Sequence, residues 1–248
     1  MKSKKLKKWT TLLTCATALT VMTACSQSSS QSTGTTSSTT SKTSAVTATT
    51  SKKTNKNNSN YFTSKDSDTS YNESSATKIK LSGSSADVSG DGAALSGSTV
   101  TISKAGTYVI SGKSDGLQIK VDAGDSDDVH IVLDGVTMTN TNAAINATSA
   151  GHVYLTLKDG TTSTLSDSSS NSDEDADAVI FSKGDLTING SGTLNIDAKK
   201  NNGIKANDSL HMTGGTYKIS SVGDAFNVND ELNITGTTMT IEAEEDAV

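Results

Sequence analysis

The stretch Leu186-Thr-Ile-Asn-Gly-Ser-Gly-Thr-Leu-Asn-Ile196 decides the fold, because it returns twice further along the chain. It recurs as Leu210-His-Met-Thr-Gly-Gly-Thr-Tyr-Lys-Ile219 and again as Leu232-Asn-Ile-Thr-Gly-Thr-Thr-Met-Thr-Ile241. The copies start 24 and then 22 residues apart. Each copy holds two short alternations of apolar and polar residues separated by glycine, and such alternation is typical of strands with one buried face.

A third short apolar segment recurs at the same period, before the first copy and after each of the three copies. It is marked by Ile180, Ile204, Phe226 and Val248. A period in the low twenties with three short strands per period predicts an all-β fold, a right-handed parallel β-helix. Because stacked coils share one core, a hydrophobic fraction of only 32% is sufficient. The absence of proline agrees, since interior strands must donate every N–H group.

The charges are divided along the 248 residues. All 27 acidic residues lie from residue 66 onward, and every one of the 21 basic residues is lysine. A nucleic-acid binder without arginine is not expected, since arginine makes the usual bidentate base contacts. The acidic part is either a solvated surface that keeps the protein soluble or a cation-binding one.

The N-terminus resembles a bacterial lipoprotein signal. Residues 1–24 join a lysine-rich start to a modestly apolar stretch, and Cys25 follows Ala24 where a lipid-modified cysteine would stand. We predict a signal peptide at 1–24, lipidation at Cys25 and a location on the extracellular face of the cell membrane. An ordinary secretory signal with an incidental cysteine is the alternative.

A Ser/Thr-rich linker, residues 25–77, is predicted to be disordered, because it offers almost no residue able to build a core. The β-helix domain is predicted at residues 78–248. The chain stops at Val248, at the start of a strand that the period would continue. An open end exposes core and unpaired backbone, so we expect the natural protein to be longer. We expect a monomer.

Two parts of the sequence resemble a family of bacterial surface carbohydrate-binding proteins. One is the run from Asp177 to Ile196 with the later Asn202-Gly-Ile204 and Gly223-Asp-Ala225; the other is Gly106–Gly112 with Val132-Leu-Asp-Gly-Val136. The resemblance covers about residues 78–248. It implies a pectate-lyase-like parallel β-helix, bound calcium and an acidic plant or wall polysaccharide as ligand.

Acidic and amide side chains recur at one turn of the predicted coils. Stacked strands lie about 4.8 Å apart, so carboxylates one above another repel unless a cation joins them. One calcium ion can touch two neighbouring rungs, because calcium–oxygen distances are about 2.3–2.6 Å. Aspartate is also simply a good turn residue. The predicted calcium ligands are Asp177, Asn202, Asp224 and Asp246, with Asp173 and Asp175 as additional donors.

An outward column of polar residues is the predicted carbohydrate surface. Its members stand at matched places in successive coils and alternate with inward apolar neighbours. They are His130, Tyr154, Thr187, His211 and Asn233. Such a flat polar ladder suits an extended polymer, but an ordinary solvated sheet face would look the same.

The sequence favours a non-catalytic, calcium-assisted binder of an acidic, polygalacturonate-like polysaccharide. A calcium-dependent polysaccharide lyase is one alternative, although its usual arginine base is missing and no lysine recurs beside an acidic set. A structural adhesin or wall-spacing stalk without a soluble ligand is the other alternative.

Overall fold

The computed structural model describes residues 46–49 and 61–248. The predicted signal peptide, Cys25 and residues 26–45 and 50–60 of the predicted linker lie outside these residues. No helix within the described ranges is long and apolar enough to cross a membrane.

The described elements are strands, with one short 3₁₀ helix, η2 (Lys65–Ser67). The first strands are β1 (Val46–Thr49), β2 (Thr77–Gly83), β3 (Ser85–Ser89), β4 (Ala93–Ser96), β5 (Thr99–Ile102), β6 (Gly106–Asp115), β7 (Gln118–Asp122), β8 (Asp128–Thr139) and β9 (Ile145–Ser149). They are followed by β10 (His152–Leu157), β11 (Thr162–Ser166), β12 (Ala178–Ser182), β13 (Leu186–Ala198), β14 (Asn202–Ala206), β15 (Leu210–Ser221), β16 (Phe226–Val228), β17 (Leu232–Thr235) and β18 (Thr238–Ala243).

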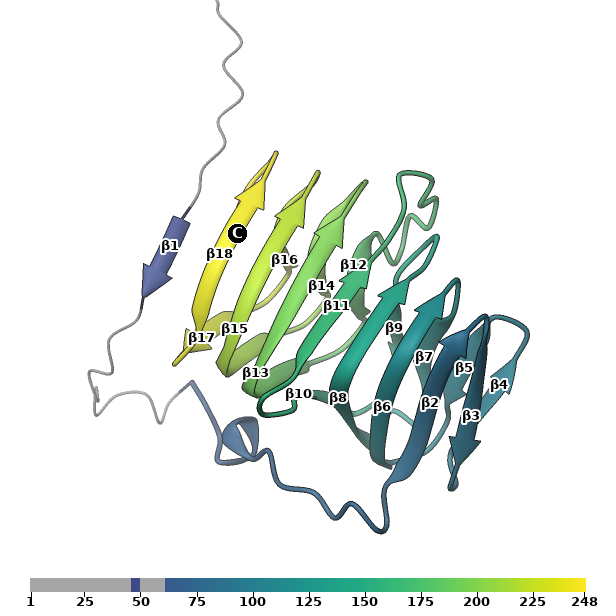
Figure 1. The fold of residues 1–248 in the computed structure, drawn as a ribbon. Coiled ribbons are helices and arrows are strands. Elements are labelled where there is room, and N and C mark those ends of the chain that lie inside the picture. Colours follow the sequence, from purple (N-terminus) through teal and green to yellow (C-terminus); the bar gives the residue numbers. More distant parts are fainter. Residues whose placement is uncertain (1–45, 50–60) are drawn as a thin grey trace, which may run out of the picture. The chain divides into compact units, whose positions relative to one another are not determined.

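The strands form two sheets. The larger has the order β1-β18-β15-β13-β10-β8-β6-β2-β3, with β11 and β17 beside this path, and the smaller has the order β16-β14-β12-β9-β7-β5-β4 (Figure 1). From β6 to β15 the neighbours in the larger sheet are parallel. The pairs β2–β3, β4–β5 and β1–β18 are antiparallel, so the sheets are mixed rather than parallel throughout.

The similar stretches of the sequence lie side by side in register. Leu186 of β13 pairs with Leu210 of β15, and Leu210 pairs with Leu232 of β17. In the smaller sheet Ile180 pairs with Ile204, and Ile204 with Phe226. The spacing that predicted the strands therefore also predicted which residues are neighbours.

Two glycines make the corner at which β13 and β15 bend. Gly190 has φ +102°, and a Cβ atom there would lie 2.2 Å from the carbonyl oxygen of Leu157. Gly214 has φ +87°, and its Cβ would lie 2.6 Å from the carbonyl oxygen of Gly190. A side chain would meet both a disfavoured backbone conformation and the neighbouring strand. The corner divides each of these long strands into two halves.

The core consists of the inward residues of both sheets. Tyr217 and Phe226 occupy inward positions and have exposed fractions of 0% and 1%. The apolar cluster is continuous from Ile79 on β2 to Ile241 on β18. Alternate positions of each strand thus bury one apolar face, as the sequence alternation predicts.

Residues 61–76, which we call the strap, lie on the larger sheet. They were predicted to belong to the linker, but η2 contacts both β13 and β15, and Asp66 within it is only 2% exposed. The ordered part of the chain therefore begins before residue 78. The physical reason is a set of long-range contacts that no local pattern in a Ser/Thr-rich segment announces.

Candidate functional site

The predicted outward column exists in the structure. His130 pairs with Tyr154, Tyr154 with Thr187, Thr187 with His211, and His211 with Asn233. The column is not a freely exposed ladder, however. Thr187 is 0% exposed and Tyr154 is 9% exposed. The strap covers this part of the face, which corrects the expectation of an open surface.

Asp66 anchors the strap to the column. Thr187 Oγ1 donates to Asp66 Oδ1 at 2.7 Å, and His211 Nδ1 lies 3.2 Å from the same oxygen. The other oxygen, Oδ2, accepts the amide and the hydroxyl of Thr63 within the strap. Burial raises the pKa of Asp66, but hydrogen bonds from Thr187 and Thr63 outweigh burial and hold the pKa below its usual value. Asp66 therefore stays ionised between the strap and the sheet.

The strap backbone is held by the next polar column of the sheet. The carbonyl of Asp66 accepts from Thr213 Oγ1 and Asn189 Nδ2, and the carbonyl of Asp68 also accepts from Asn189. Asn189 in turn accepts from Thr156 through its Oδ1 atom at 2.6 Å. Each of these buried polar groups is satisfied, as stable packing requires.

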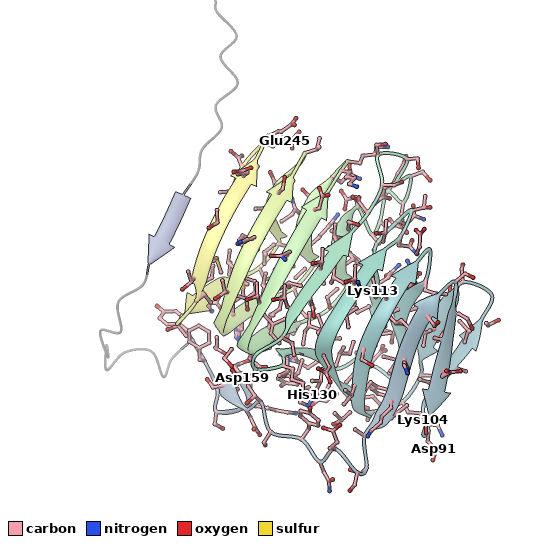
Figure 2. All side chains as sticks on the ribbon, in the orientation of Figure 1. Asp91, Lys104, Lys113, His130, Asp159 and Glu245 are labelled. Atoms are coloured by element: carbon pink, nitrogen blue, oxygen red, sulfur yellow. The ribbon has the colours of Figure 1, made fainter. Side chains whose placement is uncertain are left out.

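Aromatic rings join the strap to the histidines of the column. Phe62 meets His211 edge to face with ring centroids 5.5 Å apart, and Tyr71 meets His130 in the same way at 6.0 Å. Figure 2 labels His130 on the sheet beside the segment that precedes β2. These contacts add apolar burial to the polar anchor at Asp66.

Lys65 extends from the strap across Tyr154. Its Nζ atom lies 4.6 Å from the ring centroid, a cation–π distance, and it forms an ion pair with Asp128. His152 stacks on the Tyr154 ring with centroids 4.1 Å apart. The hydrogen bond to Asp128 raises the pKa of Lys65. Tyr154 is thus placed between a cation and an imidazole.

A pocket of about 280 Å³ opens where the strap meets β6, β8 and β10. Strap residues Lys65, Asp68 and Ser70 form one side, and Thr107, His130 and Tyr154 form the other. Aromatic rings beside hydroxyl and carboxylate groups are the usual lining of a small-molecule or sugar pocket.

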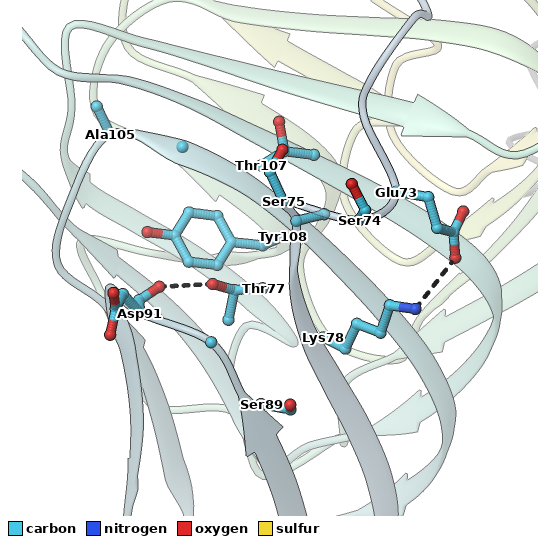
Figure 3. A pocket seen from close by; sticks show the side chains of 13 residues that line it. Glu73, Ser74, Ser75, Thr77, Lys78, Ser89, Asp91, Ala105, Thr107 and Tyr108 are labelled. Atoms are coloured by element: carbon cyan, nitrogen blue, oxygen red, sulfur yellow. Dashed lines mark hydrogen bonds and ion pairs between the residues drawn. The ribbon is translucent and has the colours of Figure 1, made fainter.

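A second pocket of about 530 Å³ adjoins the first, since both are lined by Gly106 and Thr107. Figure 3 shows Glu73 paired with Lys78 on one side, at 3.6 Å, and Thr77 donating to the carbonyl of Asp91 on the other. We call the two pockets together the strap crevice.

The strap crevice carries no surplus of positive charge. Among its described lining residues the two lysines already face carboxylates, Lys65 facing Asp128 and Lys78 facing Glu73. An acidic polymer in the crevice would therefore meet no free cation.

The histidines of this face are half-buried and lie near charged groups of the strap and the sheet. Burial lowers the pKa of His130 and of His152 below the usual histidine value. His130 Nε2 lies 2.7 Å from Thr156 Oγ1, and His152 Nε2 lies 2.9 Å from Thr187 Oγ1. Both histidines are therefore hydrogen-bonded members of the face near neutral pH.

The aspartate stack predicted as a calcium site is present, but its oxygens have other partners. Asn202 Oδ1 accepts the amide N–H of Asp224, and Asp224 Oδ1 accepts the amide N–H of Asp246. Asn202 also donates to Asp177, whose carboxylate forms an ion pair with Lys205 at 2.5 Å. Asp177 stands one residue before the register position of Asn202, since Asn202 pairs with Ala178.

Asp173 and Asp175, the additional predicted calcium donors, do not gather around this stack as metal ligands would. Asp173 Oδ1 accepts the amide N–H groups of Asp175 and Ala176, which makes a local turn. Within residues 46–49 and 61–248, no three His, Cys, Asp or Glu side chains gather as metal ligands do. As they stand, these residues fit a hydrogen-bonded ladder better than a calcium site, and calcium binding stays a prediction from the sequence.

The strap was not predicted as an ordered segment, although its sequence contains a signal. Between Trp9 and Tyr61 there is no aromatic residue, and before Asp66 there is no acid. Aromatic and acidic residues then appear together in the strap, at Tyr61, Phe62, Asp66 and Asp68. This shift in composition marks a segment able to dock.

The comparisons agree on the class of protein. A family model described as carbohydrate-binding domain-containing protein matches residues 96–248, and the chain therefore belongs to this family. A protein of Acetivibrio thermocellus with the same description is 39% identical over 137 residues, which are 53% of this chain and 48% of that protein. The chain thus spans about half the length of that curated relative.

A solved structure shares the fold. It is described as a polysaccharide lyase-like protein from C. thermocellum, in a gadolinium derivative. The match covers 70% of this chain and 93% of that one, with 25% identity and a TM-score of 0.59. The strap precedes the residues that the family model matches.

Proposed function

We propose that this protein binds a polysaccharide in the strap crevice and does not cleave it. The observation that carries the proposal is the joint lining of the crevice by the strap and the sheet, with Tyr154 and His130 facing Lys65, Asp68 and Ser70. The exposed edges of these rings offer apolar contact to a sugar, and the neighbouring polar groups supply hydrogen bonds to its hydroxyls. Membership of a carbohydrate-binding family supports it.

We further propose that the two sheets are the sides of a right-handed parallel β-helix. The parallel register from β6 to β15 and the polysaccharide lyase-like structural neighbour support this architecture. A lipid anchor at Cys25 would hold the domain at the cell surface, with the residues between Cys25 and β1 as a spacer.

An acidic polysaccharide assisted by calcium is the finer form of the proposal. Because the lysines of the crevice are paired, an acidic polymer there needs a cation to offset repulsion from Asp68 and Asp128. Binding of polygalacturonate is then expected to fall in chelator, whereas binding of a neutral glucan is expected to be unchanged.

A pull-down against a panel of insoluble and immobilised polysaccharides tests the function. Tyr154→Ala is expected to reduce binding at least severalfold, because it removes the ring that faces the crevice. Thr240→Ala, on an exposed part of β18, is the matched control and is expected to bind as the unaltered protein does. Equal binding by all three proteins would refute the crevice as the site.

A polysaccharide lyase is the second candidate, favoured by the description of the structural neighbour. Elimination on a uronate chain produces an unsaturated sugar that absorbs in the ultraviolet. We expect no increase in absorbance over polygalacturonate with calcium, and a steady increase that scales with protein concentration would establish the lyase instead.

A further inference from the structure

The sheet beneath the strap presents hydrogen-bond donors that suit an oxygen-rich ligand. Thr187, Asn189 and Thr213 donate hydrogen bonds to the strap, and the fourth residue, His211, places its Nδ1 atom 3.2 Å from Asp66 Oδ1. On the strap side the acceptors are the Asp66 carboxylate and a backbone carbonyl of the same residue. These four residues form what we call the donor cradle.

The donor cradle holds a carboxylate from a distant part of the chain. The hydrogen bond between Thr187 and Asp66 joins residues 121 positions apart in the sequence. Asp66 is 2% exposed, and its Oδ1 atom accepts from the Thr187 hydroxyl and lies 3.2 Å from His211 Nδ1. The sheet supplies no lysine or arginine to this oxygen among the described contacts, so the carboxylate is recognised by shape and by neutral or imidazole donors.

The same set of donors matches the chemistry of a uronic acid unit. Such a sugar carries a carboxylate for Thr187 and His211, and hydroxyl or ring oxygens for Asn189 and Thr213. The cradle also continues directly from the strap crevice, because Thr187 pairs with Tyr154 across adjacent strands. A polymer lying in the crevice would thus reach the cradle along the same column.

We propose that the donor cradle is a uronate-binding subsite, and that Asp66 of the strap occupies it as a built-in substitute for the sugar carboxylate. This inference rests on the proposed polysaccharide function for its physiological ligand. The strap is tethered to β2 at Thr77, and a tethered segment competes at a high effective concentration. An acidic polymer in the crevice therefore competes with the Asp66 carboxylate for the cradle, and it binds more tightly when that carboxylate is absent from the cradle.

Removal of the carboxylate tests the cradle without any polymer. Asp66→Ala keeps the Cβ atom and leaves a space of the size of formate, lined by Thr187 and His211. We expect its melting temperature to be several degrees below that of the unaltered protein. Formate is expected to restore at least half of the loss, whereas chloride at equal ionic strength is expected to restore none.

Two variants control this rescue. Asp66→Asn retains the shape of the side chain, so it leaves no space and its melting temperature is expected to be the same in formate and in chloride. The double variant Asp66→Ala with Thr187→Val lacks a cradle donor, so the formate effect is expected to disappear. If Asp66→Ala does not fold, formate is expected to restore its folded circular dichroism signal. No formate-specific effect on either readout would overturn the cradle.

Polymer binding then tests the competition. Asp66→Ala is expected to bind polygalacturonate at least severalfold more tightly than the unaltered protein, with no gain for a neutral glucan. An equal or weaker affinity for polygalacturonate would overturn the role of Asp66 as a substitute ligand. If no variant binds any polysaccharide, the proposed function fails, and formate rescue would still establish the carboxylate cradle.

Discussion

The two halves of the long strands present outward polar columns in the same register, but one column is covered and the other is exposed. Before the glycine corner the column contains Thr187 and His211, and the strap covers it. After the corner, Asn195 of β13 pairs with Lys218 of β15, and Lys218 with Thr240 of β18. Lys218 and Thr240 are exposed, and a pocket of about 350 Å³ lies between them.

The difference lies in the length and charge of the side chains. The covered half offers short donors, which a passing backbone and one carboxylate can satisfy completely. The open half carries Lys218 and Glu242, whose charged ends are costly to bury without partners. An outward polar column is thus a docking surface only where its side chains are short and complementary to the segment that packs on it.

The largest effect is expected at the corner that separates the halves. Gly190→Ala places a Cβ atom 2.2 Å from the Leu157 carbonyl at a positive φ, so neighbouring strands must move apart. We expect a loss of about 3 kcal/mol or more in the free energy of unfolding, measured by urea denaturation. Gly236→Ala also has a positive φ, but its Cβ atom would lie 3.7 Å from the nearest atom, the amide nitrogen of Gly214. A similar loss for both variants would contradict the steric explanation.

The next effect compares one hydroxyl from each half. Thr187→Val removes the donor to Asp66 and leaves a buried carboxylate oxygen short of a partner, so we expect a loss of about 1–3 kcal/mol. Thr240→Val changes an exposed position of the open half and is expected to alter stability by less than about 0.5 kcal/mol. Urea denaturation of both variants makes the comparison. Equal losses would mean that the strap does not depend on this bond.

Acid is expected to weaken the covered half first. Burial lowers the pKa of His130 and His152 in the folded protein. As the pH falls, the unfolded chain therefore binds protons on these histidines before the folded chain does. Their stabilising contribution is complete above about pH 6.5, the usual histidine pKa, and is lost as the pH falls toward the lowered folded values. The slope is at most about 1.4 kcal/mol per pH unit for each histidine.

The control for this pH dependence lies in the same face. Asp66 has a lowered pKa, so its contribution is present above about pH 3.9 and stays constant between pH 5 and 7. His130→Gln should therefore reduce the slope of unfolding free energy in this window. An unchanged slope in both His130→Gln and a His152→Gln variant would show that neither histidine is responsible.

The smallest effect is expected from calcium on the protein alone. The sequence predicts a stabilising ion at the aspartate stack, whereas the hydrogen bonds of Asn202 and Asp224 already satisfy part of the stack. From these bonds we expect nearly equal melting curves in millimolar calcium and in chelator. A rise of several degrees in calcium that Asp224→Asn abolishes would support the calcium site, since an ion bound only to the folded state stabilises it.

The sequence alone determined the strands, their neighbours and the direction of their side chains. The copies that begin at Leu186, Leu210 and Leu232 are adjacent in space because equal spacing places equivalent residues in one register. The same logic correctly aligned His130 with Tyr154. These properties depend on local alternation and on period, which one sequence displays directly.

Only the tertiary structure decided what covers each surface and which oxygens are free. Asp66 meets Thr187 across 121 residues of sequence, and no periodic pattern connects the two. The oxygens of the aspartate stack are taken by amide N–H groups whose positions depend on how the turns are seated on one another. Periodicity predicts which residues face outward, but the partner that an outward donor finds depends on long-range packing, because burial and hydrogen bonding are satisfied by the whole chain at once.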